Sequence, residues 1–134
     1  MSLAPGASIG PYEILARLGG GGMGEVWKAR DGRLGRRVAL KVIRPGGADA
    51  DSRRRFLREA RVAARLTHPN VCTLHDFGTE GDVDYLVFEL LEGETLQERL
   101  ARGPLARAEL LRVAREMAAG LARAHTEGIV HRDL

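Results

Sequence analysis

The chain has 134 residues, of which 44% are hydrophobic and 29% charged, a composition typical of an ordinary globular domain. Its one cysteine, Cys72, excludes an internal disulfide framework and suits a reducing compartment, so we expect a cytoplasmic location. No segment of the sequence is apolar over the length of a membrane-spanning helix. The net charge of +3 comes from scattered arginines, and aromatic residues make up only 4%, so we expect no nucleic-acid partner.

The first part of the chain carries the patterns of a flexible start followed by three strands. Residues 1–11 are small and rich in proline and glycine, which predicts a flexible lead-in. Strand patterns follow at 12–18, 25–30 and 36–43, and a run of glycines separates the first two. These segments therefore predict the beginning of an antiparallel sheet.

A helix is predicted after the third strand. It begins at a capping residue, Asp51 or Ser52, and ends near 66–67, before a His-Pro pair that disfavours helix. Apolar residues at helical spacing define the side that we expect to pack, namely Phe56, Ala60, Ala63 and Ala64.

Two more strands and two helices are predicted in the second half of the chain. The strand patterns lie at 71–77 and 84–90. Thr95 begins a short helix with capping-box spacing, and 105–125 has the periodicity of a longer helix that Gly128 ends. The apolar stripe of the longer helix consists of Leu110, Ala114, Met117, Leu121 and Ala124. The predicted fold class is α+β, with a five-stranded antiparallel sheet, one inserted helix and the first helices of a second, helical lobe.

Three residues with distinctive side chains are predicted to have structural roles. Trp27 is assigned to packing against the sheet, and Cys72 to a packed strand thiol rather than a redox site. His68 is expected to fix a turn before Pro69 rather than to bind a metal ion, and His75 and His125 lack the spaced partners that a metal site needs.

The run of glycines fits Gly-x-Gly-x-x-Gly through Gly19, Gly21 and Gly24, a pattern that is weak evidence alone. A P-loop needs Lys-Ser or Lys-Thr after its last glycine, whereas this chain has Glu25-Val26. A dinucleotide fingerprint opens a helix, whereas this run leads into a strand pattern. The remaining interpretation is a glycine-rich hairpin, which either approaches phosphate groups closely or is flexible and has no ligand.

Two charged residues give the hairpin a chemical context. Lys41 ends the segment Val-Ala-Leu-Lys inside an apolar strand, where burying an ammonium group without a partner is unfavourable. Glu59 lies on the predicted helix, and an ion pair between the two would aim the ammonium at phosphates near the hairpin. Taken singly, Lys41 has a plainer interpretation as an edge-strand lysine, and Glu59 as a surface helix acid.

Together these motifs resemble the bacterial eukaryotic-like, or Hanks-type, serine/threonine protein kinases, over a stretch from Tyr12 to Leu134. Several motifs in the right order make the resemblance far more specific than any one of them. The matching segments are, in chain order, 18–26 for the glycine-rich loop, 38–41 for the strand-three lysine motif, 58–60 for the αC glutamate, 68–70 and 85–96 for later landmarks, and 128–134 for the start of the catalytic loop.

The resemblance implies an ATP site beneath the glycine-rich loop. Lys41, oriented by Glu59, would hold the α and β phosphates. Phe88 falls at the gatekeeper position, and the Glu89 carbonyl and the Leu91 amide would hydrogen-bond the adenine. The residues implied to contact the nucleotide are Leu18, Gly19, Gly20, Gly21, Gly22, Met23, Gly24, Val26, Ala39, Lys41, Phe88, Glu89 and Leu91.

The resemblance also implies transfer of the γ-phosphoryl group of ATP to serine or threonine hydroxyls of a protein substrate, with Mg²⁺ as the metal. Asp133 would accept the hydroxyl proton, His131 would brace the catalytic loop, and Arg132 would pair with a phosphorylated activation segment. The magnesium ligands would lie beyond Leu134, so none is assigned here, and we expect the chain alone to be catalytically incomplete. The implied catalytic residues are Asp133, Lys41, Glu59, His131 and Arg132.

In this interpretation the chain comprises a flexible lead-in (1–11), the N-terminal lobe with its hinge (12–91) and an incomplete start of the C-terminal lobe (92–134). A full-length protein could carry a membrane anchor further along. Two other interpretations remain: a pseudokinase-like module that binds nucleotide and acts through a partner, and a small-molecule phosphotransferase, which Arg132 disfavours. The presence of all three key charged residues favours the kinase, namely Lys41, Glu59 and Asp133.

Overall fold

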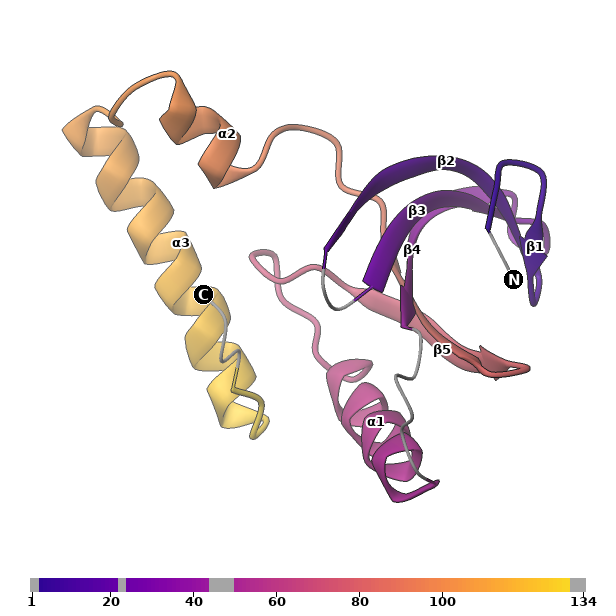
Figure 1. Cartoon of the computed structure of the whole chain (residues 1–134). Coiled ribbons are helices and arrows are strands. Elements are labelled where there is room, and N and C mark those ends of the chain that lie inside the picture. The colour runs from indigo at the N-terminus through magenta and orange to yellow at the C-terminus, as the bar shows by residue number, and fades with distance from the viewer. Residues whose placement is uncertain (1–2, 22–23, 44–49, 131–134) are drawn as a thin grey trace.

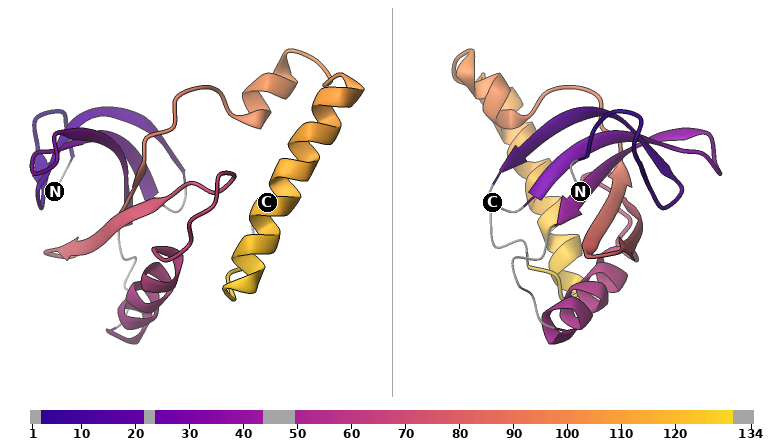
Figure 2. Two further views of the ribbon diagram at one scale, coloured as in Figure 1. Left: turned by 180° about the vertical axis from the view of Figure 1, so that it is seen from behind. Right: turned by 45° about the vertical axis from the view of Figure 1, so that its right-hand side comes forward.

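The computed structural model describes residues 3–21, 24–43 and 50–130. Within them, Figure 1 shows a curled sheet with helix α1 (Ala50–Ala63) below it and helices α2 (Leu96–Ala101) and α3 (Arg107–Thr126) to one side. The views in Figure 2 show the same separation between the sheet and the α2–α3 pair. The α+β class predicted from the sequence is confirmed.

The sheet contains six strands in the described part of the chain, in the order β1-β2-β3-β4-β6-β5, and every neighbouring pair is antiparallel. The predicted count was five, and the additional strand is β1. In chain order the strands are β1 (Ser8–Ile9), β2 (Tyr12–Gly21), β3 (Gly24–Asp31), β4 (Arg36–Ile43), β5 (Leu74–Glu80) and β6 (Val83–Glu89).

The described residues of the expected lead-in pack against the sheet. Ile9 is 4% exposed and belongs to the hydrophobic core together with Leu3. The Gly6 amide donates to the Ile14 carbonyl at 2.9 Å, and the Ile14 amide donates to the Ala7 carbonyl at 2.8 Å. Two apolar anchors and these backbone bonds order the segment, so the expectation of a flexible start fails for residues 3–11.

Side-chain alternation divides the sheet into two different faces. Along β4, Val38, Leu40 and Val42 are buried, whereas Ala39 and Lys41 between them are half-buried. Successive side chains of a strand point to opposite faces, so one face packs into the core and the other stays partly open. The core face is formed by Tyr12, Ile14, Trp27, Ala29, Val38, Leu40, Val42, Tyr85 and Val87, with Leu3 and Ile9 packed on it.

A polar cluster joins the strands at one end of the sheet. Asp31 is 1% exposed and accepts hydrogen bonds from the Arg33 and Leu34 amides and from the Arg33 side chain. Burial acts to raise the pKa of Asp31, but these hydrogen bonds outweigh it and hold the pKa below its usual value. Arg33 and Asp76 also bond the Tyr12 hydroxyl, so the cluster links β2, the β3–β4 turn and β5.

The packing side of α1 agrees with the predicted one except at its last member. Ala60 is buried, Phe56 and Ala63 are half-buried, and Ala64 is exposed. Ala64 follows the last helical residue and lies in a turn, so the helical periodicity no longer applies to it. The prediction for Ala64 is therefore wrong, and α1 packs through a narrow face against β5.

The two later helices form where the sequence predicts them. Thr95 caps α2: its side chain accepts from the Glu98 amide at 3.1 Å, while the Glu98 side chain accepts from the Thr95 amide at 2.7 Å. Gly128, with φ of 78°, follows the end of α3.

Helix α3 contacts α2 through the ion pair between Arg99 and Glu109, and it contacts the loop between α1 and β5 through the end of its apolar stripe. Ala124 and Gly120 are buried, whereas Leu110 is 52% exposed. A Cβ at Gly120 would lie 2.8 Å from the Asn70 carbonyl oxygen, so this glycine lets α3 approach the loop between α1 and β5. Figures 1 and 2 show this loop reaching towards α3. The contact holds α3 beside α1 and the sheet.

The three structural assignments have different outcomes. Trp27 is buried in the core, as predicted, and its Nε1 donates to Glu25. The Nδ1 atom of His68 accepts from the Asn70 amide at 3.0 Å, so His68 does fix the turn around Pro69. Cys72 is exposed and precedes β5, so its assignment as a packed strand thiol is wrong.

The glycine-rich hairpin joins β2 to β3, and its last glycine is required by packing. Gly24 has φ of 146°, and a Cβ there would lie 2.3 Å from the carbonyl oxygen of Val42 on β4. Gly19 differs, because a Cβ at that position meets no atom within 4 Å. The two glycines therefore serve different purposes: Gly24 permits strand packing, and Gly19 leaves open space.

Replacing Ile9 by alanine tests the packing of the N-terminal segment. We expect Ile9→Ala to lower the free energy of unfolding by about 2–4 kcal/mol, because a buried side chain leaves a cavity. Leu34→Ala, at a residue 64% exposed, is the control and changes it by less than about 0.5 kcal/mol. Urea unfolding measures both, and equal small effects would show that residues 3–9 do not belong to the core.

Alanine substitutions separate the two glycines. We expect Gly24→Ala to destabilise the fold by about 2 kcal/mol or more, since the methyl group strains the backbone and collides with Val42. Gly19→Ala, which meets open space, changes stability by less than about 1 kcal/mol. Thermal unfolding followed by circular dichroism compares them, and equal stability of the two variants contradicts this account of the hairpin.

Candidate functional site

The open face of the sheet gathers four of the residues that the sequence analysis assigned to a nucleotide, namely Val26, Ala39, Lys41 and Phe88. Across β3, β4 and β6, the register aligns Val26, Lys41 and Leu86 in one row. Ala39 and Phe88 are paired in the neighbouring row. All five are half-buried, and each alternates with buried core residues of its strand, so they share the face opposite the core.

The glycine-rich hairpin borders this face. Gly19 pairs with Val26, and Gly21 pairs with Gly24, so the end of the hairpin lies beyond the row that contains Lys41. Leu18 is 51% exposed and lies at a register shift in β2. Gly22 and Met23, also predicted to contact the nucleotide, lie outside the described residues.

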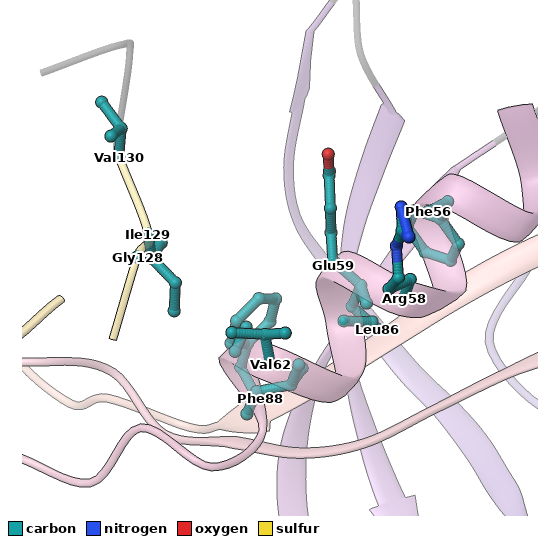
Figure 3. Close-up of a pocket in the computed structure, with 12 residues that line it drawn as sticks. Phe56, Arg58, Glu59, Val62, Leu86, Phe88, Gly128, Ile129 and Val130 are labelled. Carbon is teal, nitrogen blue, oxygen red and sulfur yellow. The ribbon is translucent and has the colours of Figure 1, made fainter. Parts of the chain in front are cut away.

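Lys41 is half-buried, and none of the described residues is its ionic partner. Among the described residues, no ion pair joins it to Glu59 or to any other carboxylate. Glu59 is exposed, and Figure 3 shows its side chain extending away from the axis of α1. The expected ion pair is thus not formed in this arrangement, in which α1 packs against β5.

Glu59 nevertheless faces the same hollow as the sheet. A cavity of about 530 Å³ is lined by Glu59 and Phe56 of α1, by Leu86 and Phe88 of β6, and by Ile129 after α3. Leu86 is the cross-strand neighbour of Lys41, so the lysine lies beside a residue that lines the cavity, although Lys41 itself is not part of the lining. Most of the lining is apolar, and the Glu59 carboxylate is a charged group at its border.

The segment 89–91 is hydrogen-bonded to the residues before β5 through Glu89, whereas Leu91 is exposed. The Glu89 amide donates to the Thr73 carbonyl at 2.9 Å, and the Cys72 thiol donates to the Glu89 carbonyl at 3.7 Å. Partial desolvation, and to a lesser extent the Glu89 carboxylate, raises the pKa of the Cys72 thiol, which keeps it a donor. Leu91 is 64% exposed, and its amide takes part in no hydrogen bond within the described chain.

The predicted catalytic residues His131, Arg132 and Asp133 lie outside the described residues. The described chain reaches the cavity just before them, because Ile129 and Val130 line it. The roles assigned to these three residues stay predictions.

Sequence reasoning missed one charged contact near the site. Asp84 on β6 is 5% exposed and accepts hydrogen bonds from the Arg53 side chain at the start of α1. The sequence did contain a signal for this contact, because Asp84 begins the apolar pattern 84–90 and a buried carboxylate requires a partner.

Two negative findings apply to the described part of the chain. No cluster of three or more His, Cys, Asp or Glu side chains there is placed to hold a metal ion. None of its helices combines the length and the apolar character needed to cross a membrane.

The geometry agrees with comparisons to known proteins. A model of the protein kinase domain matches residues 12–134. Serine/threonine-protein kinase PrkC of Bacillus subtilis is 45% identical over 127 residues, which is 93% of this chain and 20% of PrkC. Serine/threonine-protein kinase PknD of Mycobacterium tuberculosis is 42% identical over 131 residues, or 96% of this chain and 20% of PknD.

A solved structure shows the same arrangement. The crystal structure of the PknI kinase domain of Mycobacterium tuberculosis superposes with a TM-score of 0.88 at 34% identity, covering 100% of this chain and 56% of that one. The chain thus spans about a fifth of these curated relatives and about half of a solved kinase domain. The family expected from the sequence motifs is confirmed: the chain belongs to the protein kinase family, with relatives among the bacterial serine/threonine kinases.

Proposed function

We propose that the open face of the sheet, the glycine-rich hairpin and the segment 89–91 bind ATP. In the whole protein, this site would supply the γ-phosphoryl group for transfer to serine or threonine hydroxyls of a protein substrate. One observation carries the proposal: Val26, Ala39, Lys41 and Phe88 share one sheet face, which the glycine-rich hairpin borders. Kinases in general use ATP with Mg²⁺, which supports this choice of ligand.

The adenine end of the site is apolar. Val26 and Ala39 present small side chains that leave room for a flat ring against the sheet. The Glu89 carbonyl has a second lone pair besides the one that Cys72 uses, and the Leu91 amide is a donor without a partner in the described chain. One acceptor and one donor two residues apart match the edge of an adenine.

The phosphate end of the site is positively charged. Lys41 brings an ammonium group that no described carboxylate neutralises, so its field acts on an incoming anion. The hairpin adds backbone amides, and the open space at Gly19 lets phosphate oxygens approach them closely. Glu59 would pair with Lys41 in the nucleotide-bound arrangement and hold its ammonium in place.

The catalytic step is proposed for residues beyond the described part. Asp133 would accept the proton of the substrate hydroxyl, with His131 and Arg132 supporting its loop. Magnesium would neutralise the charge on the phosphates. The described residues do not form a ligand set for it. A non-catalytic nucleotide-binding module would share the ATP site, and transfer of phosphate to a protein by the whole protein separates the two functions.

The role of Lys41 can be measured by calorimetry with ATP. We expect Lys41→Ala to weaken ATP binding by roughly 10- to 100-fold, because a charge-assisted contact contributes about 1.5–3 kcal/mol. Arg112→Ala removes the same charge from the exposed surface of α3 and is the matched control, with affinity unchanged. ATP binding of equal strength in the wild type and in Lys41→Ala would refute the proposed site.

A further inference from the structure

We propose that the hydrogen-bonded ion pair between Arg53 and Asp84 is a positioning element that sets the distance from Glu59 to Lys41. The inference rests on the proposed function in one respect, namely that the distance from Glu59 to Lys41 affects the binding of ATP. Arg53 and Asp84 are positioning residues, because they act through α1 and β6 rather than by touching the nucleotide.

The bond has the geometry of a fixed contact. Arg53 Nε lies 3.0 Å from Oδ1 and 3.3 Å from Oδ2 of Asp84, and Arg53 Nη2 lies 3.4 Å from the Gly81 carbonyl oxygen. The Asp84 side chain is 8% exposed and that of Arg53 is 34% exposed. The Thr79 hydroxyl donates to Asp84 Oδ1 at 2.6 Å and so fixes the carboxylate from the neighbouring strand. A buried, oriented carboxylate makes this pair stronger than a surface salt bridge.

The position of the pair connects it to the site. Asp84 pairs with Ile43 on β4, and two residues further along β6, Leu86 pairs with Lys41. On the other side, Glu59 follows Arg53 by six residues of α1, about 9 Å along the helix axis. The bond therefore connects α1, which carries Glu59, to β6, and β6 in turn pairs with Lys41 on β4.

Other contacts of α1 are less directional. The helix packs against β5 through a narrow apolar face, with Ala60 buried and Phe56 half-buried. Among the described residues, the neighbouring Arg54 pairs only with Asp51 of the same helix, at 3.6 Å, and both side chains are about four-fifths exposed. Apolar packing allows a helix to slide or rotate, whereas the Arg53–Asp84 bond specifies where the helix begins relative to β4 and β6.

The first experiment measures the position of α1 directly, without nucleotide. Spin labels are attached to cysteines that replace the exposed residues Arg61 on α1 and Arg37 on β4, with Cys72→Ser in the background. We expect a narrow distance distribution in the parent protein, which Arg53→Ala broadens at least two-fold and Arg54→Ala leaves unchanged. An unchanged distribution in Arg53→Ala overturns the proposal.

Two further variants distinguish loss of the ion pair from a general loss of folding. Asp84→Asn keeps the size of the side chain and an acceptor for Thr79 while removing the charge, and it should broaden the distribution as Arg53→Ala does. Arg53→Lys keeps a cation at the same position and should restore the narrow distribution. A failure of Arg53→Lys to restore it, at a stability equal to that of the parent, would also overturn the proposal.

The second experiment links position to ligand binding. We expect Arg53→Ala to change the affinity for ATP at least three-fold, with Arg54→Ala unchanged. A broadened distance distribution with unchanged ATP affinity would refute the link to the site. If the parent protein does not bind ATP, the proposed function fails, whereas the distance measurement still decides whether the ion pair positions α1.

Discussion

The alternation of side chains along β4 is the constraint on which the rest of the structure depends. Val38, Leu40 and Val42 enter the core, so Ala39 and Lys41 must occupy the opposite face. A shift of the strand by one residue would bury the ammonium group and expose three core side chains, which is strongly unfavourable. The hydrophobic core therefore positions a cation that takes no part in it.

Most of the sheet and the open face could be predicted from local patterns, because period-two alternation and glycine spacing are readable in sequence. Strand β1 could not, because two residues carry no periodicity and the order of the segment comes from Leu3 and Ile9 reaching the core. The Lys41–Glu59 pair also lay outside local reasoning. Whether two charges meet depends on how α1 packs, and periodicity does not determine this tertiary arrangement.

In the described arrangement, the sheet residues of the site are held by more contacts than helix α1 is. Strands β3, β4 and β6 hold the open face through continuous antiparallel pairing, and the buried face locks them together. Helix α1 is connected to this body by a narrow apolar contact and by the buried bond between Arg53 and Asp84. In the proposed function, the sheet would present Lys41 to the phosphates of ATP, and the position of α1 would decide how firmly Glu59 holds the ammonium group.

The most direct measurement of the central claim is a map of backbone amide chemical shifts by two-dimensional NMR during titration with ATP. The account predicts that the largest changes fall on residues 19–21, 24–26, 39–41 and 88–91, which belong to the hairpin or border the open face. Residues of α2 and the exposed half of α3 should hardly change. Large changes confined to these helices, with the hairpin and Lys41 unaffected, would contradict the claim that this face of the sheet is the nucleotide site.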